Sequence, residues 1–228
     1  MSQLVRVQNF MLSQDGFGAG EGQSLDAPFG HAQEVDGSVA SLPADLGSWA
    51  FATASWAGRT EPGGSRGLDD YFTRDFPQNI GAEIMGRNKF GPQRGPWTDL
   101  DWQGWWGNTP PFHTPVFVLT HHPRPSFTLA DTTFHFLDAS PTEALQRAKE
   151  AADGKDVRIG GGVATVRQFL EADLIDAMHV AVAPIKIGRG EQLWDAPEEL
   201  LDRFHLESVS SPSGVTHLLF WRRQAAAS

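Results

Sequence analysis

Three consecutive glycines, Gly160 to Gly162, follow an apolar run that ends at Ile159 and precede a helical pattern. Because glycine has no Cβ atom, a ligand can approach such a backbone more closely than any other residue would allow. The following helix would present free N–H groups and the positive end of its dipole, which favour an anionic diphosphate. The alternative is a tight turn that binds nothing, and the segment lacks the G-x-G-x-x-G spacing of a Rossmann turn.

Four carboxylates are candidate active-site acids, and each has a structural alternative. Asp15 could bind substrate or orient a proton donor, or it could simply occupy a β-turn, where aspartate is favoured. Glu83 lies in an apolar strand on the same face as Met85, so it is either a satisfied, partly buried acid or a substrate-binding group. Asp69 and Asp70 begin a short helical pattern, and we interpret them as a charge pair at its N-terminus.

Four tryptophans crowd the irregular segment 91–115, namely Trp97, Trp102, Trp105 and Trp106. Their rings could form the roof of an aromatic substrate pocket by stacking. The alternative is that they fill the core or a dimer interface. The sequence leaves both interpretations open.

Histidines and basic residues offer weaker signals. His121 and His122 are adjacent, so on a strand they face opposite ways and cannot ligate one metal together. The other histidines lack ligand spacing, and we expect no metal site. Lys186 and Arg189 flank glycines and could either hold an anionic substrate or simply occupy a turn.

The hydrophobic pattern predicts one α/β domain over residues 1–228, with strands that alternate with helices. We expect a mixed, mainly parallel sheet of about eight strands, flanking helices and a C-terminal antiparallel hairpin around Ser211 to Gly214. Two irregular insertions interrupt it, at about 18–67 and 91–115. The predicted strands cover residues 4–12, 80–85, 116–120, 133–137, 156–159, 177–183, 204–209 and 215–221, and the predicted helices cover 68–76, 141–152 and 165–172.

The composition excludes several classes of function. The formal net charge of -10 leaves no excess of basic residues for nucleic acid, and the absence of cysteine excludes disulfides and thiolate metal sites. Residues 1–10 show no signal-peptide pattern, and no run of about 18 apolar residues follows. We therefore expect a cytoplasmic protein whose partner is a small-molecule substrate rather than nucleic acid or a membrane.

Several motifs in order make the chain resemble the dihydrofolate reductase superfamily: residues 80–87, 116–120, 158–162 and 168–170. The segments 173–176 and 183–193, together with 11–16, resemble its riboflavin-biosynthesis reductase branch. The resemblance covers roughly residues 3–17 and 68–222. It implies a three-layer fold of the dihydrofolate reductase type, NADP(H) as cofactor and, as is common in this branch, a homodimer for which the C-terminal hairpin is a plausible interface.

The resemblance also assigns candidate binding residues. Gly161 and Gly162 match a glycine pair that the family joins by a cis peptide, with Gly160–Gly161 as the alternative register. The catalytic and substrate-binding assignment of Asp15 rests mainly on this match, and Ile187 and Gly188 are further substrate-binding candidates. The cofactor-binding candidates are Gly86, Arg87, Asn88, Lys89, Thr120, His121, His122, Gly160, Gly161, Gly162, Val163, Ala164, Thr165 and Val166.

One segment departs from the family pattern. Family members usually follow the Gly-Arg pair with a helix that begins at a threonine, whereas here Asn88 to Pro92 leads into Gly-, Pro- and Trp-rich sequence. We expect that helix to be shortened or lost, with Lys89 supplying charge instead.

The resemblance implies an NADPH-dependent reductase that transfers hydride to a C=O or C=N group of a small substrate, with a heterocyclic compound as the candidate. The alternative is a non-catalytic, dimeric dinucleotide-binding module of the same fold. A true dihydrofolate reductase is disfavoured, because no motif brackets Asp69 or Asp70 as the buried acid that folate reduction needs.

Overall fold

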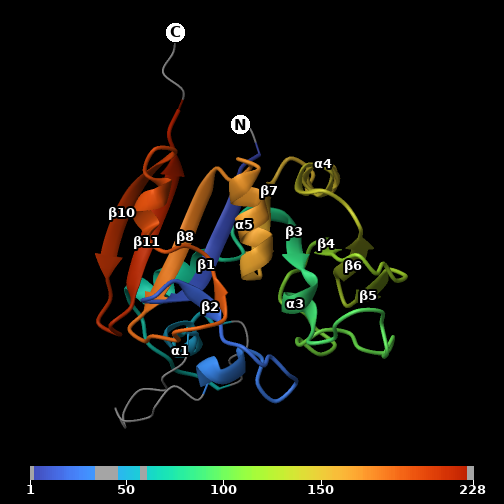
Figure 1. The fold of residues 1–228 in the computed structure, drawn as a ribbon, viewed down its shortest axis with the longest axis horizontal. Helices are drawn as coiled ribbons and strands as arrows, with labels where there is room; N and C mark the ends of the chain where they lie inside the picture. The colour runs from blue at the N-terminus through green and yellow to red at the C-terminus, as the bar shows by residue number, and fades with distance from the viewer. Residues whose placement is uncertain (1–2, 34–45, 57–60, 225–228) are drawn as a thin grey trace.

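The computed structural model describes residues 3–33, 46–56 and 61–224, which are organised around one mixed sheet of nine strands. The strand order across the sheet is β10-β11-β8-β1-β7-β3-β4-β6-β5 (Figure 1). The strands are β1 (Val5–Ser13), β3 (Ile80–Gly86), β4 (Val116–Leu119), β5 (Phe127–Leu129), β6 (Thr132–Leu137), β7 (Asp156–Gly161), β8 (Ala177–Ala183), β10 (Phe204–Ser210) and β11 (Thr216–Arg222).

The strands from β8 to β6 in this order run parallel, whereas β5 at one edge and the β10–β11 hairpin at the other run antiparallel to their neighbours. Both faces of the sheet are covered, and this explains why β3 and β8 are almost continuously buried. The predicted fold class is confirmed. The sheet has one strand more than the expected eight, because the short edge strand β5 was not predicted.

Two helices cover one face of the sheet, α4 (Pro141–Ala151) and α5 (Val163–Glu171). Ala144 of α4 and Phe169 of α5 share a buried cluster with Ile84 and Val157 of the sheet. The helix α4 begins at a capping box in which the Ser140 hydroxyl and the Glu143 carboxylate bond to each other's backbone N–H. This start was predicted from the sequence.

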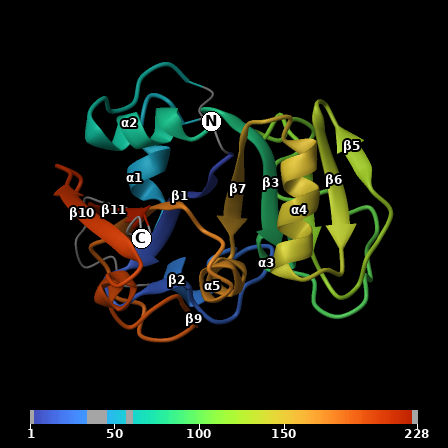
Figure 2. The same ribbon diagram turned by 90° about the horizontal axis from the view of Figure 1, so that it is seen from above.

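The insertions cover the opposite face. Figure 2 shows α1 (Ser48–Phe51) and α2 (Leu68–Asp75) on the other side of the sheet from α5. Trp49 and Phe72 from these helices pack against Ala181 of β8. Farther along the same face, aromatic residues of the second insertion pack against Met85 and Val118. The sheet is therefore the middle of three layers.

The first insertion also contains β2 (Phe17–Ala19) and the 3-10 helix η1 (Gly30–Gln33), and β2 pairs with β9 (Glu191–Gln192). Residues 34–45 and 57–60 of this predicted insertion lie outside the described residues. The second insertion, 91–115, is irregular as predicted. Two short helices remain, α3 (Arg87–Phe90) and η2 (Pro197–Leu200).

Among the described residues, the structure contains no helix with the length and apolar character that membrane spanning requires.

Candidate active site

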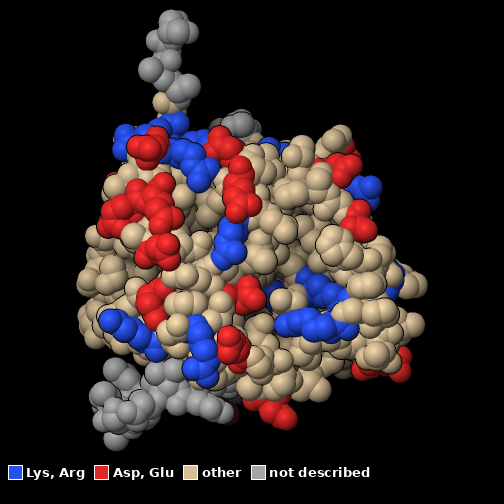
Figure 3. All heavy atoms as spheres, in the orientation of Figure 1, with Lys and Arg blue, Asp and Glu red and all other residues tan. Residues whose placement is uncertain are grey.

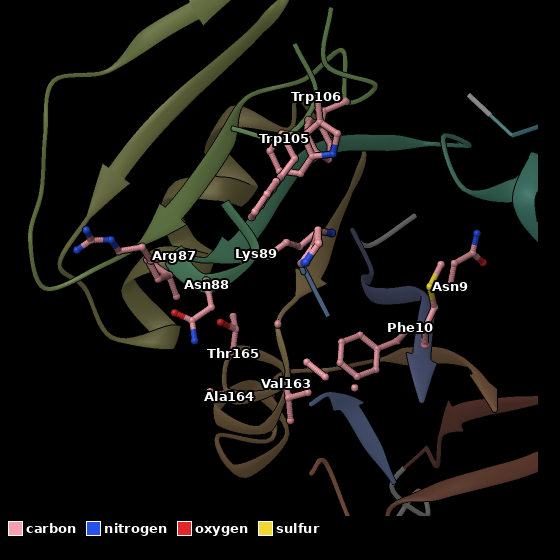
Figure 4. A pocket seen from close by; sticks show the side chains of 18 of the residues that line it. Asn9, Phe10, Arg87, Asn88, Lys89, Trp105, Trp106, Val163, Ala164 and Thr165 are labelled. Atoms are coloured by element: carbon pink, nitrogen blue, oxygen red, sulfur yellow. The ribbon is translucent and has the colours of Figure 1, made fainter. Parts of the chain in front are cut away.

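A large cavity of ≈ 1500 Å³ lies at the carboxyl ends of β3, β4, β6 and β7. Ligands of open α/β sheets bind in the crevice outside these strand ends. Two groups of residues line the cavity. One comprises the strand ends, α3 and the start of α5, and the other comprises β1 and aromatic residues from both insertions (Figure 4).

The glycine turn joins β7 to α5 at the edge of this cavity. A cis peptide bond links Gly161 to Gly162. This is the glycine pair that the sequence analysis favoured over Gly160–Gly161. Gly162 lines the cavity, and a Cβ atom added to it would meet no protein atom within 4 Å. The bare backbone at Gly162 is therefore open to a ligand.

The first turn of α5 offers backbone donors at the same place. The N–H groups of Thr165 and Val166 donate to the carbonyl oxygen of Gly162, at 3.1 Å each. Within the part of the chain that the structure describes, the N–H groups of Val163 and Ala164 have no backbone or side-chain acceptor. Because free N–H groups at a helix N-terminus attract anions, this turn fits a diphosphate. Val163, Ala164 and Thr165 line the cavity, whereas Val166 is fully buried.

The end of β3 approaches the start of α5 closely. A Cβ atom on Gly86 would collide with the hydroxyl of Thr165, so a side chain at position 86 would separate the two elements. Gly86 continues into α3, which is only four residues long, and the shortened helix that the sequence predicted is confirmed. Gly86 and Asn88 both line the cavity.

Arg87 carries unused hydrogen-bond donors. Its guanidinium lies 3.8 Å from the centre of the Trp97 ring, and Nη1 donates to the carbonyl oxygen of Gly95. The Nε and Nη2 atoms of Arg87 are buried without a hydrogen-bond partner. Burial and the nearby charges of Arg94 and Arg124 lower the pKa of Arg87. Unpaired donors beside further cations suit a phosphate group.

Basic side chains gather beside a hollow on the face seen in Figure 3. Arg87, Lys89 and Arg94 all line the cavity, although the chain as a whole is acidic. A local positive field can therefore coexist with a formal net charge of -10. Arg94 was not singled out in the sequence, where nothing distinguished it from other surface arginines.

The segment after β4 completes this side of the cavity. Thr120, His121 and His122 all line it. The hydroxyl of Thr120 accepts the backbone N–H of His122 at 3.1 Å, and Nδ1 of His121 lies 3.0 Å from the carboxylate of Asp138. His121 is thereby positioned at an exposed edge of the cavity.

Lys89, which the sequence analysis expected to supply charge, lines the cavity and points away from Arg87. Its Nζ donates to the carbonyl oxygen of Gly160 and lies 3.5 Å from Oε1 of Glu83. In Figure 4, Lys89 extends toward the side of the cavity where Phe10 lies, while Arg87 extends the opposite way. The charge of Lys89 is therefore directed to the interior end of the cavity rather than to the arginine cluster.

Glu83 is a buried structural acid. Its side chain is 0% exposed, and Oε2 accepts Nε of Arg158 at 2.8 Å and also Nη2 of the same guanidinium. Arg158 itself is 1% exposed and donates to the carbonyl oxygen of Phe76 at 2.6 Å. Glu83 does not line the cavity, so the geometry supports the satisfied-acid interpretation over substrate binding.

Asp15 stabilises the loop that contains Ile187 and Gly188. Its carboxylate accepts the Ser13 hydroxyl at 2.6 Å and the backbone N–H groups of Ile187 at 3.1 Å and Gly188 at 2.8 Å. Although burial acts in the opposite direction, these three hydrogen bonds lower the pKa of Asp15. Asp15, Ile187 and Gly188 do not line the cavity. The catalytic and substrate-binding roles of the three residues stay predictions that the geometry does not favour.

Asp69 and Asp70 lie in the first turn of α2, at the helix N-terminus as predicted, and in addition each has a hydrogen-bond partner outside the helix. Asp69 accepts the Ser211 hydroxyl at 2.7 Å and lies 2.8 Å from Nε2 of His217, and both aspartates are buried. Asp70 accepts the backbone N–H of Ser55 at 2.7 Å. The partners come from elements far away in the sequence, which a local pattern cannot reveal.

A chain of buried hydrogen bonds continues from Asp69 to the cavity wall. His217 Nδ1 lies 2.9 Å from His179 Nε2, and His179 Nδ1 lies 2.9 Å from Oδ1 and 3.2 Å from the backbone N of Asn9. Asn9 has a φ of 52° at an irregularity in the pairing of β1 with β8, and it lines the cavity. The histidines therefore hold the bend of β1 that precedes Phe10.

The second half of the cavity is aromatic. Trp105 and Trp106 line it. Trp97, Trp102 and Trp106 pack against the buried cluster beneath, so the tryptophans serve both as cavity lining and as core, and Trp106 does both. Phe10, which the sequence analysis missed, would lie 3.2 Å from a Cβ atom on Gly161. The aromatic residues that line this half are Phe10, Phe29, Phe51, Trp56, Phe76, Trp105, Trp106 and Phe112.

The structure brings most of the cofactor-binding candidates together. Gly160, Gly161 and Val166 lie behind the cavity wall rather than on it. The candidates that line the cavity are Gly86, Arg87, Asn88, Lys89, Thr120, His121, His122, Gly162, Val163, Ala164 and Thr165.

Fold and site together define a reductase-like α/β protein, and comparison with known families agrees. The chain belongs to the family of the RibD C-terminal domain, whose family model matches residues 51–217. This membership supports a reductase-type function. No curated protein sequence matches the chain.

Solved structures support the fold. A riboflavin biosynthesis protein from Shewanella sp. PV-4 is similar over 98% of this chain and 100% of its own, with 20% identity and a TM-score of 0.51. Dihydrofolate reductase from Enterococcus faecalis, solved with NADP(H) and RAB-propyl, is similar over 97% of each chain, with 12% identity and a TM-score of 0.50. At this identity, the similarity establishes the dihydrofolate reductase-like fold alone.

Proposed function

We propose that the protein is a reductase that uses NADPH to transfer a hydride to a C=O or C=N group of a small, flat substrate. The observation that carries the proposal is the open backbone at Gly162, which leads into the free N–H groups of Val163 and Ala164 at the wall of a ≈ 1500 Å³ cavity. Family membership supports the same class of activity.

Different residues of the chain would bind different parts of the dinucleotide. Val163 and Ala164 would donate their N–H groups to the diphosphate, with the dipole of α5 adding to the attraction. Arg87 would use its unpaired Nε and Nη2 donors for the additional phosphate that distinguishes NADPH from NADH. His121 would contact the same region from the rim. When bound, the dinucleotide supplies the hydride.

The aromatic half of the cavity would hold the substrate. Trp105, Trp106 and Phe76 would exclude water and stack against a planar ring. A ribosylated or aromatic heterocycle fits this lining. The described carboxylates on the cavity wall are Asp138 and Glu191, and both are exposed. Because folate reduction needs a buried acid beside the pterin, this lining disfavours a true dihydrofolate reductase.

The proposal is tested by adding NADPH to the purified protein and following the quenching of tryptophan fluorescence. Consumption of NADPH is then followed with phenanthrenequinone, a flat aromatic diketone, as the probe substrate. We expect saturable quenching followed by oxidation. Saturable binding without oxidation of any carbonyl or pterin probe would favour the alternative function, a dinucleotide-binding module without turnover. Absence of both signals would contradict the proposal.

We further propose a homodimer that forms through the C-terminal hairpin. β10 is an edge strand of the sheet, and Val209 of β10 and Trp221 of the adjacent strand β11 expose 38% and 50% of their surfaces. Exposed edge strands are ready sites for pairing with another chain. Light scattering should give the mass of two chains for the wild type and of one chain for Trp221→Glu, and a monomeric wild type would contradict the proposal.

A further inference from the structure

Three charged groups meet behind the glycine turn, and their charges do not cancel. Among the described residues, the charged groups that act on Lys89 are Glu83 of β3 and Arg158 of β7. Arg158 occupies one oxygen of Glu83 through two donors, and Lys89 Nζ lies 3.5 Å from the other oxygen. One carboxylate thus faces two cations, and the cluster retains a positive charge.

Lys89 is the member of this cluster that reaches the cavity. Its side chain is 29% exposed, whereas those of Glu83 and Arg158 are 0% and 1% exposed. A lysine ammonium has three donors. Two of these are directed to Glu83 and to the carbonyl oxygen of Gly160, so one remains for a ligand.

Lys89 lies beside the glycine turn, at the end of the cavity where the reaction would take place. Its aliphatic stem passes 3.8 Å from where a Cβ atom on Gly161 would lie, and Phe10 flanks the same point at 3.2 Å. Lys89 therefore lies where the glycine turn and the aromatic half meet. The phosphate-binding candidate Arg87 extends the opposite way (Figure 4).

We propose that Lys89 is a catalytic residue of the reduction, and that its Nζ binds and then protonates the oxygen of a neutral carbonyl substrate. This inference rests on the proposed function. Negative charge develops on a carbonyl oxygen as hydride adds, and a preorganised cation in a water-poor site stabilises it. A protonated C=N group would instead be repelled by Lys89, so the inference selects C=O over C=N.

The step balances. The carbonyl carbon accepts a hydride from a reduced pyridine dinucleotide, the π electron pair moves to the oxygen, and the oxygen takes a proton from Lys89 Nζ. The products are an alcohol, the oxidised dinucleotide and a neutral amine, which regains a proton from water. Burial lowers the pKa of Lys89, with Glu83 opposing and Arg158 adding to this effect, which makes it a readier proton donor than a surface lysine.

A binding test separates this role from a structural one without requiring turnover. The probe is p-nitrophenol, whose phenolate is yellow and mimics an oxyanion, titrated with and without NADP+. We expect the wild type and Lys89→Arg to bind the phenolate and lower the apparent pKa of the phenol. Lys89→Met should bind it at least ~10-fold more weakly. The exposed Lys155, replaced in Lys155→Met, provides the matched control and should behave as the wild type.

The kinetic test uses NADPH and phenanthrenequinone. Lys89→Met should lose about 10²- to 10³-fold in kcat with a smaller change in KM, and thermal unfolding of each variant verifies folding. Wild-type phenolate binding retained in Lys89→Met, or no phenolate binding by the wild type, would overturn the inference. If the wild type binds no dinucleotide, the proposed function fails, while the p-nitrophenol titration without NADP+ still decides whether Lys89 forms an oxyanion site.

Discussion

The buried pair His179 and His217 should make the stability of the protein depend on pH. Asp69 accepts a hydrogen bond from Nε2 of His217, so Nδ1 of His217 is free to accept from Nε2 of His179. Nδ1 of His179 can then accept the backbone N–H of Asn9. Both rings carry one proton each in this arrangement. An additional proton would place a buried imidazolium between Trp49 and Phe72.

The size of this pH effect on the free energy of unfolding follows from the pKa of His179. Burial, with the neighbouring His217, lowers it from 6.5 to about 3. Between these values the unfolded chain binds a proton that the folded chain does not, so the contribution is complete above pH 6.5 and is lost as the pH falls toward 3. At about 1.4 kcal/mol per unit, the full loss is roughly 5 kcal/mol, comparable with the whole stability of many domains.

Urea denaturation at a series of pH values measures this dependence directly. The free energy of unfolding should fall steeply on acidification in the wild type and less steeply in His179→Phe, whose side chain does not titrate. The same replacement at the exposed His205 removes a histidine without disturbing the buried pair, and it serves as the control. Parallel pH profiles for the wild type and His179→Phe would refute the reasoning.

Three other predictions concern the site and its supports. Gly160→Ala should destabilise the fold by about 1–3 kcal/mol in urea denaturation, because its Cβ would overlap the buried Glu83 carboxylate; unchanged stability would contradict this geometry. Arg87→Gln should weaken NADPH binding by roughly 10- to 100-fold in calorimetry and leave NADH binding unchanged, so an equal loss for both would remove Arg87 from the phosphate site. Asp15→Asn should lower stability by about 1–2 kcal/mol and leave NADPH affinity within about twofold, whereas a large loss of turnover at normal stability would restore the catalytic assignment.

Regular elements with strong local signals were predictable from the sequence. The helix Pro141–Ala151 begins at the expected capping box, and the strand Ala177–Ala183 has the predicted bounds because a proline follows it. The helix Val163–Glu171 begins two residues earlier than predicted, since Gly162 precedes it without a capping side chain. The strand Phe127–Leu129 was missed because three residues are too few to give a periodic signal.

The binding half of the site was predictable for a physical reason. Consecutive glycines and a helix start are local features, so Gly162, Val163 and Ala164 could be placed from the sequence alone. The acid–base clusters could not be predicted from the sequence. Arg158 meets Glu83 across 75 positions, and His217 meets Asp69 across 148, and such partners are fixed by the sheet order rather than by spacing.

The direction of Lys89 was unpredictable for the same reason. In the sequence it follows Gly86 and Arg87, and this suggested a second cation for phosphate. In the structure, Glu83 and the carbonyl oxygen of Gly160 attract its ammonium to the opposite end of the cavity. The sequence shows that Lys89 is a cation, but the packing of the strands β3 and β7 determines where its ammonium points.

The central claim is that a pyridine dinucleotide lies against bare backbone at Gly162. Calorimetric titration of the wild type and Gly162→Ala with NADPH tests it most directly, because the added methyl group meets no protein atom within 4 Å and projects into the cavity. The account predicts unchanged thermal stability and affinity at least ~10-fold weaker in the variant. Equal affinities, or no heat of binding in the wild type, would contradict it.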